Sequence, residues 1–228
     1  MLMLNKIAAG YNGEVVLEDI TASFSENGIH GLIGLNGSGK TTLMRVIYGL
    51  HKVYSGSVKF RNSGTNGQVA FLETENYFYH SITGPEYLSL LNNHKGFDFS
   101  PWMRLFNLPA KGFIEEYSSG MKKKLALIGV VCSGKPLLLL DEPFNGLDME
   151  SVRILTQVLK LLRAKGKTIL ITSHILSSMT EVCDTLTIIR NGRVTKSFDF
   201  VDAVEIEEQV YRELDNQIQQ QIETLTIV

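Results

Sequence analysis

The feature that most constrains the fold of this chain is a glycine-rich stretch at residues 34–42. It fits the phosphate-binding pattern G-x-x-x-x-G-K-[ST], in which a strand turns sharply into a helix. A short apolar run at 29–33 precedes the stretch, and apolar residues at helical spacing follow it from Leu43 to Leu50. The backbone N–H groups of such a loop and the positive end of the helix surround an anionic phosphate. The stretch therefore predicts a nucleotide site.

The residue types in this stretch are those that phosphate binding requires. Glycine lets the backbone turn and approach a phosphate without a Cβ in the way. We expect Lys40 to reach the terminal phosphates and the Thr41 hydroxyl to ligate Mg²⁺. The alternative is an ordinary glycine-rich turn, and the strand-loop-helix context favours the nucleotide site over it. The residues expected to bind the nucleotide here are Asn36, Gly37, Ser38, Gly39, Lys40, Thr41 and Thr42.

Charge and composition exclude several classes of protein. The 22 basic and 24 acidic residues give a formal net charge of −2, so no overall basic field indicates nucleic acid as a partner. Cys132 and Cys183 lack metal-ligand spacing, and we interpret them as buried thiols in a reducing compartment rather than as a disulfide. The start of the chain lacks the apolar core of a signal peptide, and no run of about 18 apolar residues occurs. We expect a soluble, cytosolic chain.

Alternating strand and helix patterns predict an α/β fold. We expect one domain over 1–228, with a phosphate-loop nucleotide-hydrolase core, a mainly parallel sheet and an N-terminal antiparallel β subdomain. The core with its β subdomain is assigned to 1–74 and 133–198. Residues 75–132 form a predicted helical insertion, whose aromatic side chains between Tyr77 and Phe106 we interpret as a small core rather than a ligand cage. Residues 199–228 form a predicted amphipathic helical tail, which either folds onto its own domain or binds a partner.

Two acidic residues, Asp141 and Glu142, directly follow the leucine run at 137–140. Open parallel sheets bind ligands at the carboxyl ends of their strands. We expect Asp141 to hold Mg²⁺ and Glu142 to act as general base toward an attacking water. His174 follows the next strand at the same edge and could orient that water by a hydrogen bond to the terminal phosphate. The alternatives are solvated strand-capping acids and a structural histidine.

A second anion site is suggested by Ser118, which stands where a helix N-cap is predicted. On the residues alone this signal is weak. The lysines that follow it, residues 122–124, are interpreted as a solvated helix face.

The order of these motifs resembles that of ATP-binding-cassette (ABC) ATPases, over residues 1–197. In that family the phosphate loop reads G-P-N-G-x-G-K-S/T-T, so Leu35 stands in place of proline. Residues 117–121 resemble the signature L-S-G-G-Q, and residues 141–143 match the second nucleotide motif with its catalytic glutamate. Further matches are residues 145–148, which resemble the dimer-contacting S-A-L-D segment, the switch histidine His174, the adenine-stacking aromatic Tyr11 and the closing hairpin at 183–193.

The resemblance implies a single cassette of the exporter type, for drugs, peptides or lantibiotics, with ATP and Mg²⁺ as cofactors. ATP is expected between the phosphate loop of one chain and Ser118 and Gly120 of another, in a head-to-tail homodimer or a paired cassette. Such cassettes serve an integral-membrane permease as its motor, which implies a cytoplasmic location at the inner face of the cell membrane. The roles implied are catalytic for Glu142 and His174, metal-binding for Thr41 and Asp141, and nucleotide-binding for Tyr11, Ser118 and Gly120.

The chain departs from the family at the end of the strand near Val69–Leu72. A glutamine that contacts Mg²⁺ and the water is usual there, whereas this chain has Glu73, Thr74 and Glu75. Spacing places Thr74 at the glutamine position, and either glutamate could substitute for it. The signature is also altered, because Ser119 replaces a glycine and Met121 replaces the glutamine.

Two other functions remain open at the level of the sequence. The first is an ABC ATPase that acts on nucleic acid or ribosomes, disfavoured by the single cassette, the short insertion and the lack of a basic field. The second is a regulatory cassette deficient in hydrolysis, which the altered glutamine position suggests and Glu142 and His174 argue against. If the chain is the motor subunit of a transporter, we expect the permease to dock at residues 73–88.

Overall fold

Two β-sheets organise the molecule, of which the computed structural model describes residues 1–91, 97–174 and 176–199. One sheet has three antiparallel strands in the order β2-β1-β4, and the other has six in the order β5-β6-β7-β3-β8-β9. The strands are β1 (Leu2–Tyr11), β2 (Glu14–Phe24), β3 (Ile29–Ile33), β4 (Ser55–Phe60), β5 (Val69–Leu72), β6 (Leu137–Asp141), β7 (Thr168–Ser173), β8 (Thr185–Arg190) and β9 (Arg193–Asp199).

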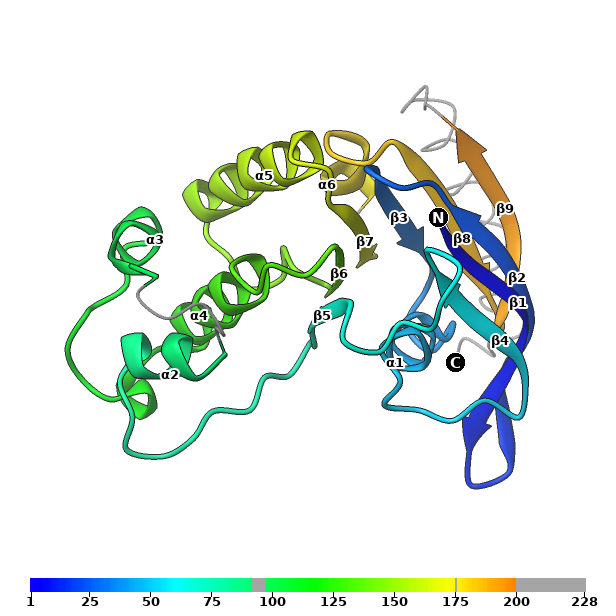
Figure 1. Ribbon diagram of the computed structural model, residues 1–228, viewed down its shortest axis with the longest axis horizontal. Coiled ribbons are helices and arrows are strands. Elements are labelled where there is room, and N and C mark those ends of the chain that lie inside the picture. The colour runs from blue at the N-terminus through cyan, green and yellow to red at the C-terminus, as the bar shows by residue number, and fades with distance from the viewer. Residues whose placement is uncertain (92–96, 175, 200–228) are drawn as a thin grey trace, which may run out of the picture.

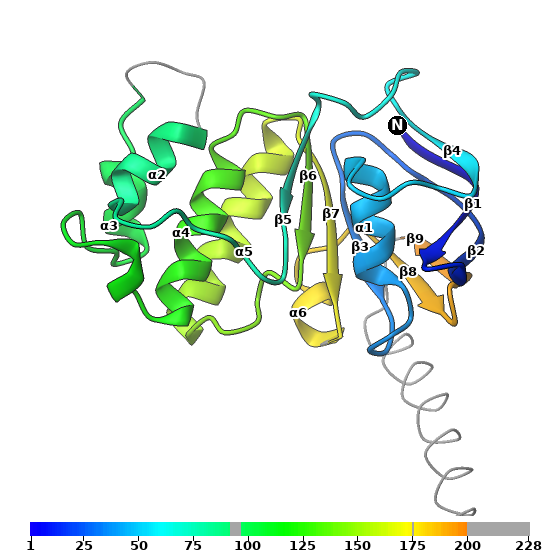
Figure 2. The same cartoon turned by 90° about the horizontal axis from the view of Figure 1, so that it is seen from below.

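The helices alternate with the strands of the larger sheet. They are α1 (Lys40–Tyr48), α2 (Gly84–Leu91), α3 (Ser100–Leu105), the 3₁₀ helix η1 (Ile114–Glu116), α4 (Ser119–Val131), α5 (Met149–Ala164) and α6 (Leu176–Thr180). Figures 1 and 2 show α1 on one side of the six-stranded sheet, toward the antiparallel sheet, and α4 and α5 on the other side. The predicted fold class, with its parallel core sheet, antiparallel N-terminal strands and helical insertion, is confirmed.

The six-stranded sheet is buried on both faces. Every residue of β3, β6 and β7 is buried, as expected for parallel strands covered by helices. One core packs α1 between the two sheets, and its buried members include Leu43, Ile47, Phe60 and Leu139. The other core joins the opposite face of the sheet to α4 and α5. The sheet is therefore held from both sides, which fixes the positions of its strand ends.

Parallel pairing brings three strand ends to one edge. β6 pairs with β7, so that Asp141 lies opposite Thr172, and β7 pairs with β3, so that Ser173 lies opposite Ile33. The hairpin expected at the far end of the sheet is also present: β8 and β9 pair antiparallel across a turn at Asn191 and Gly192, both with positive φ. The edge formed by β6, β7 and β3 carries the candidate site.

The helical insertion differs in two respects from its prediction. Helical structure begins at Gly84 rather than near Glu75, because Thr83 and Glu86 form a capping box: the Thr83 N–H donates to Glu86 Oε2 at 2.7 Å and the Glu86 N–H to Thr83 Oγ1 at 3.4 Å. The aromatic residues build only part of the expected small core. Tyr87, Phe99 and Phe106 are buried, whereas the side chains of three others are exposed to solvent, namely Tyr77, Tyr79 and Phe97.

The two cysteines are free thiols, as expected. Cys132 and Cys183 are both partly buried, and burial raises the pKa of the Cys132 thiol to about 12. Among the described residues, no helix is long and apolar enough to cross a membrane. The predicted tail at 199–228 lies outside the described residues except for Asp199, and the domain boundaries assigned from the sequence stay predictions.

Candidate nucleotide-hydrolysis site

The glycine-rich loop connects the end of β3 to the start of α1, as its motif predicts. Gly39 is the N-cap of α1 with φ 103°, and Gly37 has φ 80°, so both need a backbone that other residues rarely adopt. A Cβ at Gly39 would lie 2.6 Å from Leu17 Cδ2, and one at Gly34 would lie 2.3 Å from the Ile189 carbonyl oxygen. At Gly34 and Gly39 the loop therefore has no room for a side chain, and helix starts of this kind leave backbone N–H groups that can donate to an anion.

Three polar residues of the stretch at 34–42 are buried, namely Ser38, Lys40 and Thr42. The Lys40 ammonium donates to the carbonyl oxygens of Gly34 and Leu35 at 2.7 and 3.2 Å, which places it across the loop. Burial lowers the pKa of Lys40, and the carboxylates of Glu142 and Asp141 oppose that shift. The Ser38 hydroxyl is buried without a hydrogen-bond partner among the described residues. A buried hydroxyl without a partner is costly, so this loop fits an anionic ligand that would accept from it.

Asp141 is the centre of the acidic cluster. Its Oδ2 accepts from Thr41 Oγ1 and from Thr74 Oγ1, both at 2.8 Å, while the Thr172 hydroxyl donates to Oδ1. These hydroxyls come from α1, from the segment after β5 and from β7, respectively. The carboxylate is completely buried, and three donors stabilise its charge there.

Glu142 and His174 meet at the same edge. The His174 Nδ1 lies 3.0 Å from Glu142 Oε2, so the two candidate catalytic side chains are in contact. Glu142 has φ 49°, a left-handed conformation that is strained for a residue with a Cβ. Its backbone N–H donates to Thr172 Oγ1 at 2.9 Å, which helps to hold that conformation. One threonine thus orients both acidic residues.

Arg45 connects Tyr11 to Glu73, which precedes Thr74 at the position where the family has its glutamine. Tyr11 ends β1 with 41% of its surface exposed and its ring 4.5 Å from that of His51. A hydrogen bond with Tyr11 and an ion pair with Glu73, whose Oε1 lies 3.0 Å from Arg45 Nε, raise the pKa of Arg45. Glu73 is therefore directed at Arg45, and the residue that reaches Asp141 is Thr74, as spacing placed it.

Ser118 and Gly120 lie elsewhere in the molecule. Ser118 is the exposed N-cap of α4, and its hydroxyl accepts from the Met121 N–H at 3.2 Å, as its position in the sequence predicts. In Figures 1 and 2, α4 lies beyond β5 and β6 from α1 and the phosphate loop. One chain therefore does not bring its signature residues to its own phosphate loop.

Sequence reasoning missed two residues of the site. Thr172 carried a faint signal, because it precedes Ser173 and His174 at the end of a strand predicted to neighbour Asp141. Lys123 was assigned to a solvated face, and this interpretation is wrong. Its side chain is 7% exposed, and its ammonium lies 3.4 Å from the Asp141 carbonyl oxygen. A run of three lysines gives no sign that its middle member points inward.

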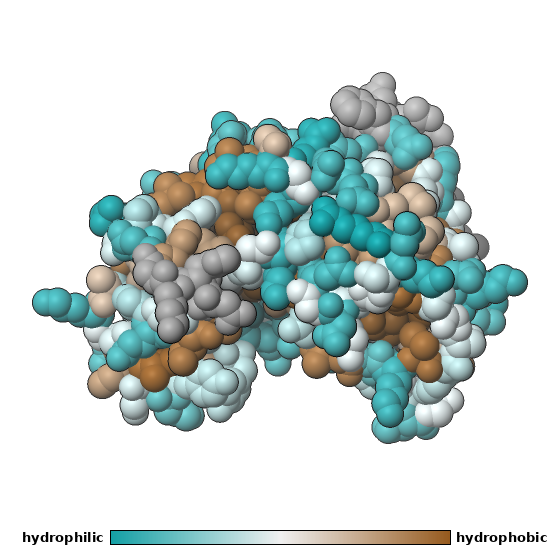
Figure 3. Space-filling model, viewed as in Figure 1, coloured by the Kyte–Doolittle hydropathy of each residue, from teal (hydrophilic) through white to brown (hydrophobic). Residues whose placement is uncertain are grey.

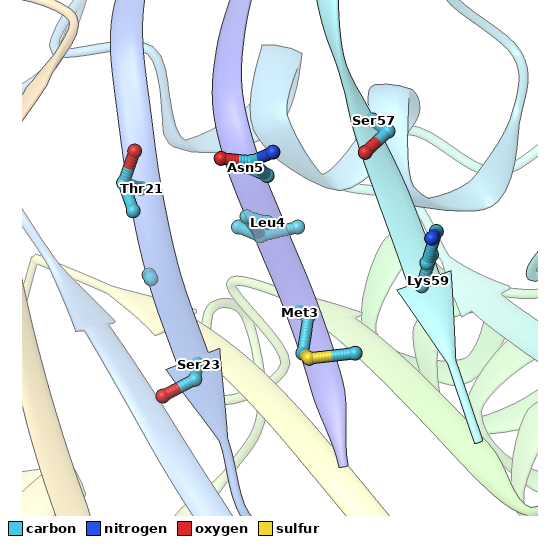
Figure 4. A pocket seen from close by; sticks show the side chains of 8 residues that line it. Met3, Leu4, Asn5, Thr21, Ser23, Ser57 and Lys59 are labelled. Atoms are coloured by element: carbon cyan, nitrogen blue, oxygen red, sulfur yellow. The ribbon is translucent and has the colours of Figure 1, made fainter. Parts of the chain in front are cut away.

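A separate pocket lies on the outer face of the antiparallel sheet. Its volume is about 540 Å³ and it contains none of the predicted site residues; Figure 4 shows its lining side chains on three neighbouring strands. Its lining consists of Met3, Leu4, Asn5, Thr21, Ala22, Ser23, Ser57 and Lys59. The chemistry-bearing residues are therefore gathered at the sheet edge and not in this pocket.

Comparison with known proteins places these motifs in a family. Residues 17–145 match the model of the family described as ABC transporter. The lantibiotic transport ATP-binding protein SrtF of Streptococcus pyogenes is 26% identical over 91% of this chain and 95% of its own length. A solved ATP binding subunit of an ABC transporter is 29% identical, with a TM-score of 0.85 over 94% of this chain and 99% of its own.

A second solved structure shares the fold alone. It is a dimeric ATP-binding cassette in a post-hydrolysis state, bound to ADP and Pi. It is 19% identical, with a TM-score of 0.76, and the match covers 87% of this chain and 98% of that one.

The Thr172 hydroxyl is expected to contribute to stability. Thr172→Val keeps the branched shape but leaves Asp141 Oδ1 without this donor and the Glu142 N–H without its acceptor, at a cost of about 1–3 kcal/mol in the free energy of unfolding. Thr74→Val is the matched control. Its side chain is exposed and Thr41 still donates to the same oxygen, so the cost should stay within about 0.5 kcal/mol.

Urea unfolding of both variants and of Thr172→Ser measures this difference. Thr172→Ser keeps the hydroxyl and should recover most of the lost stability. Equal losses in the two valine variants would contradict the assignment of Thr172 as the residue that holds the acidic pair.

Proposed function

Because the chain belongs to the ABC transporter family, we propose that it is the ATP-hydrolysing motor subunit of a membrane transporter. The observation that carries this proposal is the convergence of Lys40, Asp141, Glu142 and His174 at one edge of the sheet. The similarity to a lantibiotic transport protein favours an exporter among the transporters. Its place is then the cytoplasmic face of the membrane, where it is held by an integral-membrane permease.

The phosphate loop binds the nucleotide. Its N–H groups and the Ser38 hydroxyl donate to the phosphates, and Lys40 turns from the loop carbonyls to the terminal phosphates. Tyr11, half exposed at the end of β1, offers its ring for stacking on the adenine. Asn36 and Gly37 line the exposed turn of the loop, and Thr42 lies buried in the first turn of α1. The loop thus recognises the triphosphate, and Tyr11 recognises the base.

The donor set at Asp141 fits Mg²⁺. Thr41 and Asp141 would hold the ion together with phosphate oxygens, and Thr74 lies beside them on the same carboxylate oxygen. The described residues contain no cluster of three or more histidine, cysteine or acidic side chains, and Mg²⁺ at phosphates needs only one or two carboxylates. When bound, the ion supplies charge that stabilises the oxygens of the transferring phosphoryl group.

Glu142 and His174 act on the attacking water. Glu142 accepts its proton as the water oxygen bonds to the γ-phosphorus and the bond to the β-phosphate oxygen breaks, giving ADP and inorganic phosphate. His174 touches the Glu142 carboxylate at 3.0 Å and donates its other ring N–H toward the terminal phosphate. This contact favours an active ATPase over a regulatory cassette, because it places a histidine beside the carboxylate that is proposed to act as general base.

A second copy of the chain completes the site. Ser118 is exposed and Gly120 half-buried at the start of α4, a helix that lies on the other side of β5 and β6 from α1. In a head-to-tail dimer they face the γ-phosphate bound by the partner, where the N-terminus of α4 stabilises its negative charge. The dimeric cassette of like fold is consistent with this arrangement.

The permease is proposed to dock on the segment between β5 and α2. Figure 1 shows this connection running along one edge of the molecule, and Figure 3 shows that brown hydrophobic patches occur on both halves of this face, so the proposal rests on the exposed aromatic side chains of the segment. Tyr77 and Tyr79 are 76% and 56% exposed, with their rings edge to face at 5.8 Å. Exposed aromatic pairs of this kind favour a protein partner, whereas the net charge of −2 disfavours nucleic acid.

Two variants separate binding from hydrolysis. Lys40→Ala removes the phosphate-directed ammonium and should abolish nucleotide binding, while Glu142→Gln should bind ATP normally and lose at least about 100-fold in kcat, within the range assigned to general acid-base catalysis. Fluorescent ATP binding and phosphate release measure these two properties. Turnover close to wild type in Glu142→Gln would contradict the proposed role of the carboxylate.

The docking surface is tested by a photoreactive phenylalanine analogue at position 79, in the full chain expressed in cells that hold the transporter. We expect a crosslink to a membrane protein with several spans. Tyr54, which is 52% exposed between α1 and β4, is the matched control and should give no such product. A crosslink at 54 and none at 79 would overturn the assignment of this surface.

A further inference from the structure

Lys123 is a buried cation that the proposed chemistry does not use. It lies in the second turn of α4, the helix capped by Ser118, with 7% of its surface exposed. Its ammonium lies 3.4 Å from the backbone carbonyl oxygen of Asp141. The helix that starts at the signature therefore reaches the strand end that carries the acidic pair.

The charge of this lysine is costly where it stands. Burial lowers the pKa of Lys123, and the carboxylates of Asp141 and, to a smaller extent, Glu142 oppose that shift. An apolar side chain of similar length would fill the same space without desolvating an ammonium, and such replacements are often neutral or stabilising in buried ion clusters. The lysine is therefore better explained by its contact with the Asp141 carbonyl, which positions α4, than by a contribution to the free energy of unfolding.

The next residue supplies a second link, between α4 and the start of α5. The Lys124 ammonium lies 2.6 Å from Asp148 Oδ2, and the other carboxylate oxygen of Asp148 caps α5 by accepting from the Ser151 N–H at 2.8 Å. Gly120 is also close to this region, since a Cβ there would lie 3.1 Å from the Gly146 carbonyl oxygen. The first turns of α4 are thus fixed to both ends of the connection from β6 to α5.

We propose that Lys123 is a positioning residue that holds the signature end of α4 in register with Asp141 and Glu142 of the same chain. The inference rests on the proposed function, because Ser118 then contacts the nucleotide of the partner while Asp141 and Glu142 serve the chain's own nucleotide. Lys123 connects the two surfaces through which one chain contacts two ATP molecules. Without this link each chain still binds nucleotide, but its two contact surfaces no longer match those of a second copy.

The test compares Lys123→Met, which removes the ammonium, with Lys123→Arg, which keeps a cation. Lys122→Met, a half-buried neighbour in the same helix, is the matched control. We expect Lys123→Met to lower kcat about tenfold while KM and nucleotide binding by the single chain stay within about twofold. In the Glu142→Gln background, the same change should weaken ATP-dependent dimerisation about tenfold, as measured by sedimentation. Lys123→Arg should recover most of both losses, and Lys122→Met should match its parent.

The outcomes separate this inference from the function on which it rests. The inference alone is overturned if the Glu142→Gln parent dimerises with ATP, Lys123→Met in that background dimerises equally well, and Lys123→Met by itself turns over as the wild type does. A parent that never dimerises with ATP overturns the proposed function and the inference together. If Lys123→Met does not fold, Lys123→Arg carries the test: dimerisation within about threefold of the parent supports the proposal, and a tenfold loss contradicts it.

Discussion

The buried carboxylate of Asp141 is the interaction on which the rest of the site depends. A charged group with no exposed surface is stable only when donors surround it, and here Thr41, Thr74 and Thr172 donate to its two oxygens. Those hydroxyls belong to the helix after the phosphate loop, the segment leading to the helical insertion and the neighbouring strand. One carboxylate therefore ties together the parts of the chain that must meet around a bound nucleotide.

The order of strands explains why these parts meet. β7 lies between β6 and β3, so the acidic pair, His174 and the phosphate loop emerge from three adjacent parallel strands at one edge. Two hydrophobic cores, one on each face, hold those strands in place. The same architecture puts α4 on the other side of the sheet from α1, which is the basis of the proposal that the signature end of a second chain completes the site. Within one chain, the Lys123 ammonium on α4 contacts the backbone carbonyl of Asp141 at the end of β6.

The fold and most of the site could be predicted because local chemistry determines them. A glycine with positive φ before a lysine, four leucines before two acids, and an Asn-Gly turn each specify a conformation without distant contacts. The expected start of the helical insertion was wrong, because a capping box at Thr83 and Glu86 decides it against a broader helical pattern. Thr172 and Lys123 were missed because their roles arise only from tertiary contact with Asp141, which a single sequence does not display. The roles assigned to individual site residues stay predictions.

The central claim is that the phosphate loop is half of a site and that the signature of a second copy supplies the other half. Sedimentation of Glu142→Gln with and without Mg²⁺ and ATP, next to the same variant carrying Ser118→Ala, tests this claim most directly. We predict an ATP-dependent dimer with one nucleotide per chain, lost or strongly weakened by Ser118→Ala although each single chain still binds ATP. A chain that binds and hydrolyses ATP as a monomer, with no effect of Ser118→Ala, would contradict the account.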